Sequence, residues 1–357
     1  MNSLSDCKFP IIDMRDVKES DWGLEHGQRF KKEIKELSLI RRELMIKKNP
    51  KLEGDIDRLA NEQLEVSKKY NPQLFHELEN ISKGSGVSLI DLVILNNYTD
   101  FRDIQLNDEG CTTISCKDNM NQVGQTWDMH GSAANYICIL IYPKKILFSL
   151  VGCLGMMGVN SQGLFLGVNN INTKNAKAAL LWPMLVSDLL DKNSIDDMRE
   201  GLNNAPVTSG HNYLIADKDL GEHWEISPTQ RELVFNNVSG DGKKLVYHTN
   251  HCLSPELQRE EDQISGNSTT FNRFEIMKEY NLEFKESKID DLYEILTSHK
   301  GYPKSICSHS MSSDTDPSMT CGGGLYDFNE KRFQVWRGCK KTGNYIEHSF
   351  VTEEIFS

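Results

Sequence analysis

The alternation of hydrophobic and polar positions divides the chain into a helical first third and a strand-rich remainder. Between residues 20 and 82, apolar side chains recur at helical spacing, for example from Phe30 to Ile40, among many Lys and Glu residues. Pro50 interrupts this stretch, because the residue before a proline avoids the helical conformation. A short apolar piece at residues 9–14 predicts one strand ahead of these helices.

From residue 111 onward the pattern is typical of strands. Continuous apolar runs, which predict strands covered on both faces, occupy residues 136–142, 146–151 and 164–168. Further strands are predicted at 122–128, 211–217, 223–226, 233–235 and 245–248, a terminal hairpin at 324–336, and helices at 89–96, 178–190, 194–202, 269–281 and 289–298. The glycine-rich residues 152–160 lack the Lys-Ser/Thr of a phosphate loop and are predicted to be a turn that lines a pocket. This arrangement predicts a layered α/β (α+β) fold.

Composition and charge narrow the classes of function. The chain of 357 residues carries 40 basic and 52 acidic side chains, a net charge of −12, which argues against nucleic-acid binding because a phosphate backbone requires a basic face. No apolar run is long enough to span a membrane, and the N-terminus lacks the pattern of a secretory signal. Nine cysteines without a regular spacing indicate reduced thiols. We therefore expect a cytoplasmic protein with no nucleic-acid or membrane partner.

The candidate chemistry begins at Gly110-Cys111, where the helical pattern ends. Cysteine carries the strongest ordinary nucleophile, and the preceding glycine leaves its carbonyl open to attack by the thiol. An N-to-S acyl shift and hydrolysis would cut the chain there and leave Cys111 with a thiol and a free α-amine. That amine, with a pKa of about 8, can act as the general base. Taken alone, Cys111 also fits a small buried residue at the start of a strand.

Two further motifs give this pair a context. Gly-Cys-Thr-Thr at 110–113 is followed by Gly-Gln-Thr-Trp-Asp at 124–128 and by Thr-Asn-His at 249–251. In this order the motifs resemble those of the acyl-CoA:6-aminopenicillanic acid acyltransferase family, which also contains carcinine-type (β-alanyl-amine) hydrolases. The resemblance implies a self-processing N-terminal-nucleophile hydrolase with a four-layer α-β-β-α sandwich. It also implies that residues 1–110 remain bound as a small α subunit, while residues 111–357 form the catalytic β subunit of the same domain.

The same resemblance suggests roles for individual residues. Cys111 is the expected nucleophile and Asp128 the carboxylate beside the thiol and the α-amine. Asn250 is the expected oxyanion donor, because a side-chain amide donates two hydrogen bonds. Thr112 and Asn212 are possible supporting residues. Each of these side chains also has an ordinary structural interpretation, such as a loop-capping Asp or an Asn that closes a turn.

One feature departs from the family pattern. The family places an Arg shortly before a small-residue strand near the C-terminus, but residues 313–320 contain none. Asp314 and Asp316 stand there instead and would suit a cationic amine, although an acidic loop is usually a solvated one.

Three alternatives remain open from the residues. His211, His248, His251, His299 and His309 are numerous enough for a metal-dependent amidohydrolase, but no metal-binding helix motif is present. A papain-like Cys-His pair would need neither Gly110 nor a long leader. A non-catalytic binding protein on the same fold would keep the chain uncut.

We expect an amidohydrolase or N-acyltransferase that works through a thioester acyl-enzyme. Its substrate would be a small amide or acyl thioester, acyl-CoA included. Neither a cofactor nor a catalytic metal is expected, and a homo-oligomer is left open.

Overall fold

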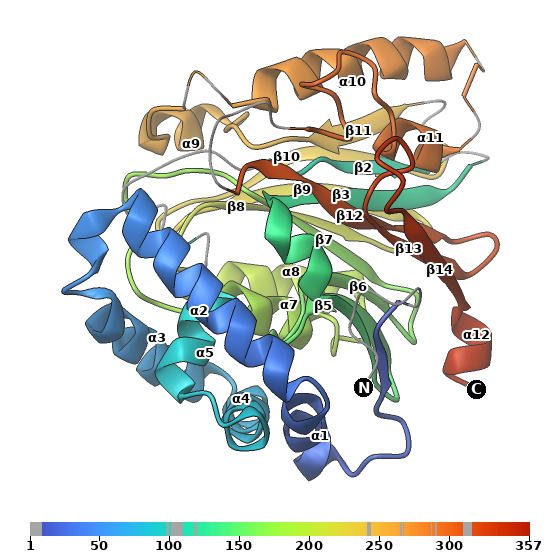
Figure 1. Cartoon of the computed structure of the whole chain (residues 1–357). Coiled ribbons are helices and arrows are strands. Elements are labelled where there is room, and N and C mark those ends of the chain that lie inside the picture. Colours follow the sequence, from blue (N-terminus) through green and yellow to red (C-terminus); the bar gives the residue numbers. More distant parts are fainter. Residues whose placement is uncertain are drawn as a thin grey trace.

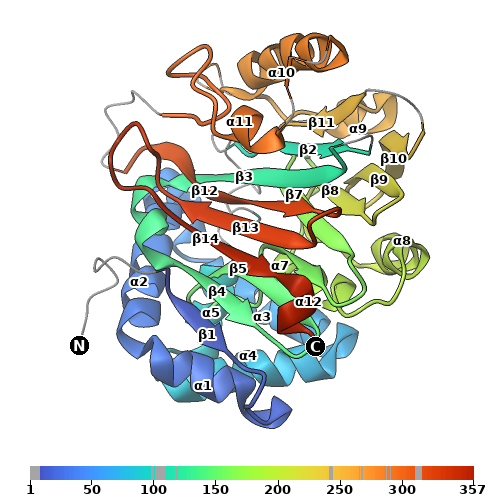
Figure 2. The same cartoon turned by 90° about the vertical axis from the view of Figure 1, so that its right-hand side faces the viewer.

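The computed structural model describes residues 9–97, 100, 110–117, 120–240, 244–264, 266, 268–286, 288–289, 291–309 and 316–357. Two β-sheets lie face to face, and helices cover the outer face of each (Figure 1; Figure 2). The expected four-layer α-β-β-α sandwich is therefore confirmed.

The first third of the chain forms the helices that the apolar spacing predicts. They are α1 (Trp22–Arg29), α2 (Lys31–Lys48), α3 (Ile56–Tyr70), α4 (Pro72–Ser85) and α5 (Leu89–Asn96). Pro50 begins a short 3-10 turn between α2 and α3. Asn71 and Ser88 cap α4 and α5, since each side-chain oxygen accepts from backbone N–H groups of the first helical turn.

The larger sheet has eight strands and includes the strand predicted near the N-terminus. Its order is β1 (Ile11–Asp13), β4 (Ile137–Ile141), β5 (Lys145–Leu150), β6 (Met157–Asn160), β7 (Phe165–Asn170), β8 (His211–Ala216), β9 (Leu220–Ile226) and β10 (Arg231–Val238). β1 pairs in parallel with β4, and the other neighbours are antiparallel. Helices α1 to α5 and α7 (Trp182–Leu189) cover this sheet on the side away from the second one (Figure 1).

The smaller sheet has six antiparallel strands. Its order is β11 (Leu245–His248), β2 (Thr113–Cys116), β3 (Gln122–His130), β12 (Ser318–Asp327), β13 (Arg332–Arg337) and β14 (Ile346–Val351). Helices α10 (Thr270–Lys285) and α11 (Leu292–Leu296) lie above it (Figure 1). The remaining helices are α8 (Ile195–Asn204), α9 (Pro255–Glu260) and α12 (Thr352–Ile355).

Gln125 joins the two sheets directly. Its side-chain amide donates to the carbonyl of Val168 and accepts from the N–H of the same residue, both at 2.6 Å. A side-chain amide can donate to and accept from the same backbone residue only at a fixed distance. The contact therefore sets the spacing between β3 and β7 beside the segment that carries Cys111.

One local prediction is wrong, and one predicted helix begins later than expected. Gly152 to Asn160 was expected to line a pocket, but Gly152 packs against Ile34 and Leu95 of the leader helices, and its N–H donates to His26 at 2.9 Å. The helix predicted at 178–190 begins only at Trp182, so Pro183 occupies the first turn of α7, where its missing N–H costs nothing.

No helix in the described part of the chain is long and apolar enough to cross a membrane.

Candidate active site

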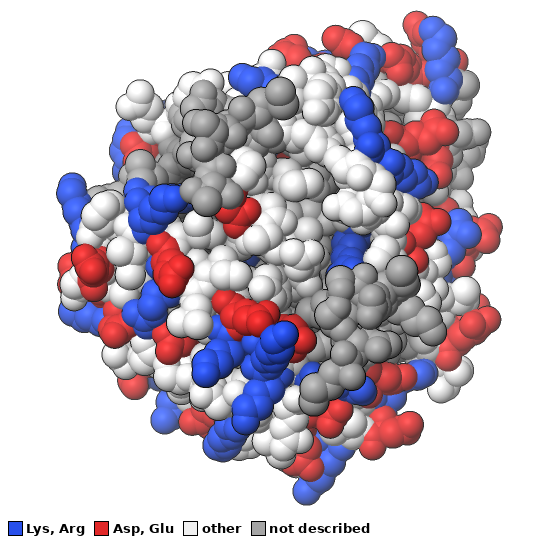
Figure 3. Space-filling model, in the orientation of Figure 1, with Lys and Arg blue, Asp and Glu red and all other residues white. Residues whose placement is uncertain are grey.

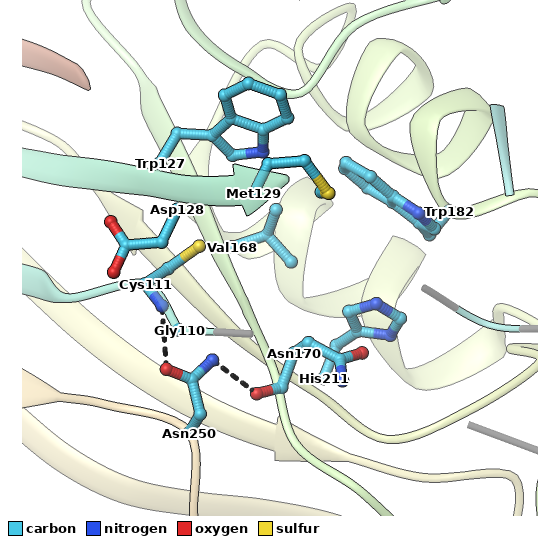
Figure 4. Close-up of a pocket in the computed structure, with 10 residues that line it drawn as sticks. All are labelled: Gly110, Cys111, Trp127, Asp128, Met129, Val168, Asn170, Trp182, His211 and Asn250. Atoms are coloured by element: carbon cyan, nitrogen blue, oxygen red, sulfur yellow. Dashed lines mark hydrogen bonds between the residues drawn. The ribbon is translucent and has the colours of Figure 1, made fainter. Parts of the chain in front are cut away.

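A pocket opens beside the segment before β2, lined by residues of the internal strands β3, β7 and β8 (Figure 4). Its volume is about 370 Å³, which includes solvent space at the open mouth. The lining residues are Gly110, Cys111, Trp127, Asp128, Met129, Val168, Asn170, Trp182, His211 and Asn250. The four residues expected to carry the reaction, Gly110, Cys111, Asp128 and Asn250, are thus brought together although the sequence separates them widely.

Cys111 lies two residues before β2 and is 8% exposed. Its backbone N–H donates to Asn250 Oδ1 at 2.7 Å (Figure 4). Its carbonyl accepts from Arg273 Nη1 at 2.6 Å. The backbone N–H and carbonyl of Cys111 are therefore both fixed by side chains that are distant in the sequence.

Gly110 is required by the close approach of Arg273. A Cβ at position 110 would lie 2.2 Å from Arg273 Nη2 and 2.9 Å from Cζ. The guanidinium is the rigid end of a fully buried side chain, so it has no room to withdraw. Position 110 therefore requires glycine for steric reasons, in addition to the open carbonyl that the chemistry needs.

Arg273 is the residue that sequence reasoning missed. It comes from α10 and is 0% exposed. Its guanidinium donates to Cys111 O, to Thr112 Oγ1 at 3.0 Å and to Asn250 Oδ1 at 2.8 Å. Burial lowers the pKa of Arg273, and the nearby Asp128 and Cys111 oppose this change. The cation that residues 313–320 lack is thus supplied by another element.

Asp128 lies on β3 with its carboxylate beside the Cys111 thiol (Figure 4). It is 2% exposed, and its Oδ1 accepts from Thr320 Oγ1 at 2.7 Å. Thr320 is in turn held by the N–H of Ser308 at 2.8 Å and donates its own N–H to Ser308 O at 2.9 Å. A β-bulge in β12 falls between Thr320 and Gly322, opposite Asp128 and Trp127. Bulges commonly redirect side chains next to active sites.

Asn250 follows β11 and presents both ends of its amide to the site. Oδ1 faces the N–H groups of Cys111 and Arg273, which are donors only, so this end must be the carbonyl. Nδ2 donates to Asn170 O at 2.7 Å. The amide therefore connects the segment at Cys111 to the end of β7.

The two possible supporting residues have different surroundings. Thr112 touches the site, because its hydroxyl accepts from Arg273. Asn212 does not line the pocket. Its Nδ2 donates to Asn169 Oδ1 at 2.8 Å, in a buried polar layer between the sheets that also contains Thr113 and His223.

The far wall of the pocket is mostly apolar. Trp127, Met129, Val168 and Trp182 face the thiol across it (Figure 4). His211 adds a neutral imidazole, because burial lowers its pKa to about 4. Among the described residues, Trp182 Nε1 and His211 Nδ1 have no hydrogen-bond partner. The pocket therefore offers a hydrophobic wall with a few polar atoms for orienting a ligand.

Asp316 does not line this pocket. Asp316 accepts from the N–H of Ser132 at 2.9 Å and from its hydroxyl at 2.5 Å, and lies 3.2 Å from His130 Nδ1. These contacts lower its pKa strongly, in opposition to burial, and make it a structural group. Asp314 lies outside the described residues.

Of the five histidines considered for a catalytic metal, only His211 lines the pocket, and His299 and His309 lie together elsewhere. His248 is occupied by Glu225 at 2.8 Å and by the carbonyl of Thr249 at 2.7 Å. His251 contacts Thr249 and Thr270. Neither lines the pocket, whereas His211 does.

On the face shown in Figure 3, acidic and basic side chains are intermixed around the edge, and the described residues in the middle are mostly uncharged.

Comparison with known proteins places the chain among enzymes of acyl transfer. The 40 kDa form of acyl-coenzyme A:6-aminopenicillanic-acid-acyltransferase from Emericella nidulans is 26% identical over 244 residues, which are 66% of this chain and 67% of that protein. Solved structures with a weaker likeness include a mutant of conjugated bile acid hydrolase from Clostridium perfringens (TM-score 0.43, 12% identity, 70% of this chain and 94% of that chain). Another is penicillin V acylase from Agrobacterium tumefaciens (TM-score 0.32, 12% identity, 64% and 83%).

A family model matches residues 115–341, well over half of the chain. The protein is accordingly an enzyme that acts on acyl groups, as its fold and motifs indicated. The chain belongs to the acyl-coenzyme A:6-aminopenicillanic acid acyl-transferase family. The matched stretch includes Asp128, Asn250 and Arg273 and begins after Cys111.

Proposed function

We propose that this protein is a self-processing cysteine amidohydrolase or acyltransferase, cut between Gly110 and Cys111, that works through a thioester on Cys111. The observation that carries the proposal is the hydrogen bond from the Cys111 N–H to Asn250, in a pocket that Asp128 also lines, with Arg273 packed against Gly110. Cutting the peptide bond between Gly110 and Cys111 would convert this fixed backbone N–H into a fixed α-amine beside the thiol.

The cut itself is an intramolecular acyl transfer. The Cys111 thiol gives its proton to Asp128, and the sulfur attacks the carbonyl carbon of Gly110. The C–N bond breaks as the nitrogen takes up a proton, which leaves Gly110 joined to Cys111 as a thioester. Water then hydrolyses the thioester and frees the Gly110 carboxylate. Arg273, whose guanidinium lies against Gly110, supports the negative charge that develops on the carbonyl oxygen.

In the mature enzyme the α-amine replaces Asp128 as the base. It takes the thiol proton, and the sulfur attacks the carbonyl of a bound amide or thioester. The proton passes to the leaving amine or thiol, and the acyl group stays on Cys111. Asn250 retains its predicted role as an oxyanion donor through Nδ2, and holds the α-amine through Oδ1. Water then completes hydrolysis, or an amine completes transfer.

The acyl part of the substrate would lie on the apolar wall. Trp127, Met129, Val168 and Trp182 suit a hydrophobic acyl chain, and the polar atoms of Trp182 and His211 suit an amide or carbonyl group within it. Because Asp316 is engaged by Ser132 and His130, this residue gives no support to a cationic amine in the pocket.

The leader would remain attached after the cut as the small α subunit. Its strand β1 belongs to the eight-stranded sheet, and Gln63, Tyr70 and Asn71 donate to Thr208 and Asp188 of the larger part. In addition, Tyr142 of the larger part donates to Glu77 at 2.6 Å. Contacts of this number and burial would hold the two pieces together without a covalent bond.

A reducing, cytoplasmic compartment fits the cysteines. The eight cysteines that the structure describes are all buried and form no disulfide with one another, as expected outside the secretory pathway.

The cut is tested by mass spectrometry and a denaturing gel of the purified full chain. Wild-type protein should yield two fragments, one ending at Gly110 and one beginning at Cys111, whereas Cys111→Ala should remain one chain and be inactive. Cys116→Ala, at a buried cysteine of the neighbouring strand, is the control and should be cut normally. If Cys111→Ala is still cut at Gly110, or if uncut wild-type protein turns over acyl amides and acyl thioesters normally, the proposal is wrong.

A further inference from the structure

Four side chains with metal-ligating atoms meet away from the pocket lining. They are His299, Cys307, His309 and Cys339, and their ligating atoms all lie within 4.8 Å of one another. Three come from the loop after α11, and Cys339 comes from the turn after β13 (Figure 2). Cys307 and Cys339 are each 3% exposed, so their sulfurs are shielded from solvent.

The spacing of these atoms matches a tetrahedral ion. Zinc bonds of about 2.0 Å to nitrogen and about 2.3 Å to sulfur place neighbouring ligand atoms about 3.3 to 3.8 Å apart. In this structure His299 Nε2 lies 3.2 Å from His309 Nε2 and 3.1 Å from Cys339 Sγ, and Cys307 Sγ lies 3.6 Å from His309 Nε2. These three distances are close to the values for a tetrahedral zinc ion, and every other pair of ligand atoms lies within 4.8 Å.

The backbone around the cluster holds this geometry. The Cys307 N–H donates to Ser298 O and the His309 N–H to Pro303 O, both at 3.0 Å, which closes the loop on itself. Gly338, with φ +71°, forms the turn that precedes Cys339. A side chain is excluded at this position because a Cβ would lie 2.2 Å from Asn344 O. The N–H of Lys341 donates to Cys339 Sγ at 3.3 Å. Such outer hydrogen bonds orient metal ligands and stabilise a thiolate.

We propose that His299, Cys307, His309 and Cys339 bind one zinc ion in a closed, structural Cys₂His₂ site. Two thiolates balance the charge of the ion, so the site is neutral beside the Lys341 ammonium, which itself lies 3.7 Å from the centre of the Tyr302 ring. Four protein ligands leave no open position, so this ion does no chemistry on a substrate.

The site also fixes the catalytic carboxylate, in the part of this inference that rests on the proposed function. Ser308 stands between two of the ligands, and its backbone holds Thr320 through two hydrogen bonds. Thr320 in turn donates to Asp128. An ion bound to Cys307 and His309 would therefore position Asp128 through Ser308 and Thr320.

Metal content of the full-length chain tests the site without reference to activity. Untagged protein, purified under reducing conditions and desalted, should retain about one zinc per chain by elemental analysis. Replacement by cobalt should give the visible bands of a tetrahedral ion with thiolate-to-metal charge transfer. Cys111→Ala should bind the same amount of zinc, so the result does not depend on the proposed reaction.

Variants assign the ligands. Cys339→Ser and His299→Ala should lower zinc affinity at least about tenfold and slow cutting at Gly110, whereas His348→Ala, at an exposed histidine of β14, should do neither. Wild-type protein that holds no zinc and takes up no cobalt overturns the proposal, and so does a Cys307–Cys339 disulfide found by mass spectrometry of freshly isolated protein. Zinc bound normally with cutting unaffected in Cys339→Ser would overturn both the ligand set and the link to Asp128.

Discussion

The Arg273 guanidinium donates to four oxygen atoms: Thr269 Oγ1, Cys111 O, Thr112 Oγ1 and Asn250 Oδ1. A planar fork makes several of these bonds at once, which the single ammonium of a lysine cannot do. Because the side chain is buried, these bonds also offset the cost of removing its charge from water. Arg273 thus fixes both the backbone at Cys111 and the amide of Asn250.

Replacing Arg273 by lysine should slow cutting and turnover by about 100-fold, because charged hydrogen bonds of about 1.5 to 3 kcal/mol each are lost. Arg273→Met should be slower still. The measurement is the rate of appearance of the two fragments, followed by turnover of an acyl amide. Lys278→Met, on the exposed side of the same helix, should leave both rates unchanged. Equal rates in Arg273→Lys and wild type would exclude the proposed role.

Asp128→Asn should slow cutting more than about 100-fold, because the amide cannot take the thiol proton, and should also slow turnover. Thr320→Val removes one hydrogen bond to that carboxylate and should cost about tenfold. Time courses of cutting in the purified variants measure both effects, with Thr229→Val at an exposed threonine as the control. Unchanged rates in Asp128→Asn would remove it from the mechanism.

Much of the site is predictable from sequence because its members stand in short motifs. Gly110, Cys111, Asp128 and Asn250 each do so, and all four line the pocket. Arg273 has no such motif, since it is a single basic residue in a charged helix, and only the packing of α10 on the second sheet shows where it points. Cys307 and Cys339 were missed for a related reason. They are far apart in sequence and meet only through the loop after α11.

At the scale of elements, the ends of helices could be predicted from local sequence, but the pairing of strands could not. Ser88 begins α5 as its capping side chain predicts, and Pro50 ends the first helical stretch. In contrast, no sequence pattern indicates that β1 joins β4 in parallel, because that pairing connects residues more than a hundred positions apart. Such contacts depend on the assembled core, in which Ile12 and Ile139 are both fully buried.

This pairing predicts that the cut protein stays in one piece. After complete cutting, the fragments ending at Gly110 and beginning at Cys111 should elute together from a sizing column in high salt, since β1 contributes backbone hydrogen bonds and buried apolar surface that salt does not screen. Fragment masses in the eluted peak provide the measurement. Loss of the leader under these conditions would contradict its assignment as a retained subunit.

At the scale of the whole molecule, buried neutral histidines make the fold sensitive to acid. Burial lowers the pKa of His26 to about 3 and that of His211 to about 4, whereas the unfolded chain titrates near 6.5. As the pH falls below about 6.5 the unfolded state binds protons first. The free energy of unfolding therefore decreases from that pH down to the folded pKa values.

Between pH 7 and pH 5 these two groups should together remove about 4 kcal/mol of stability. Denaturant titrations of Cys111→Ala, which is expected to remain one chain, give the measurement. His26→Gln keeps an acceptor for the Gly152 N–H but does not titrate, so its stability should depend less on pH. Equal pH dependence in the two proteins would show that His26 is not responsible.

The shared sheet has one more consequence, for the lifetime of each copy. Before cutting, β1 and β4 belong to one polypeptide and find each other within it. After cutting, a molecule that unravels sheds its edge strand into dilute solution, so renaturation becomes a two-body encounter that weakens with dilution. Cutting would therefore remove the covalent link that makes refolding efficient. The active form would then persist because it unfolds slowly, and not because it refolds readily.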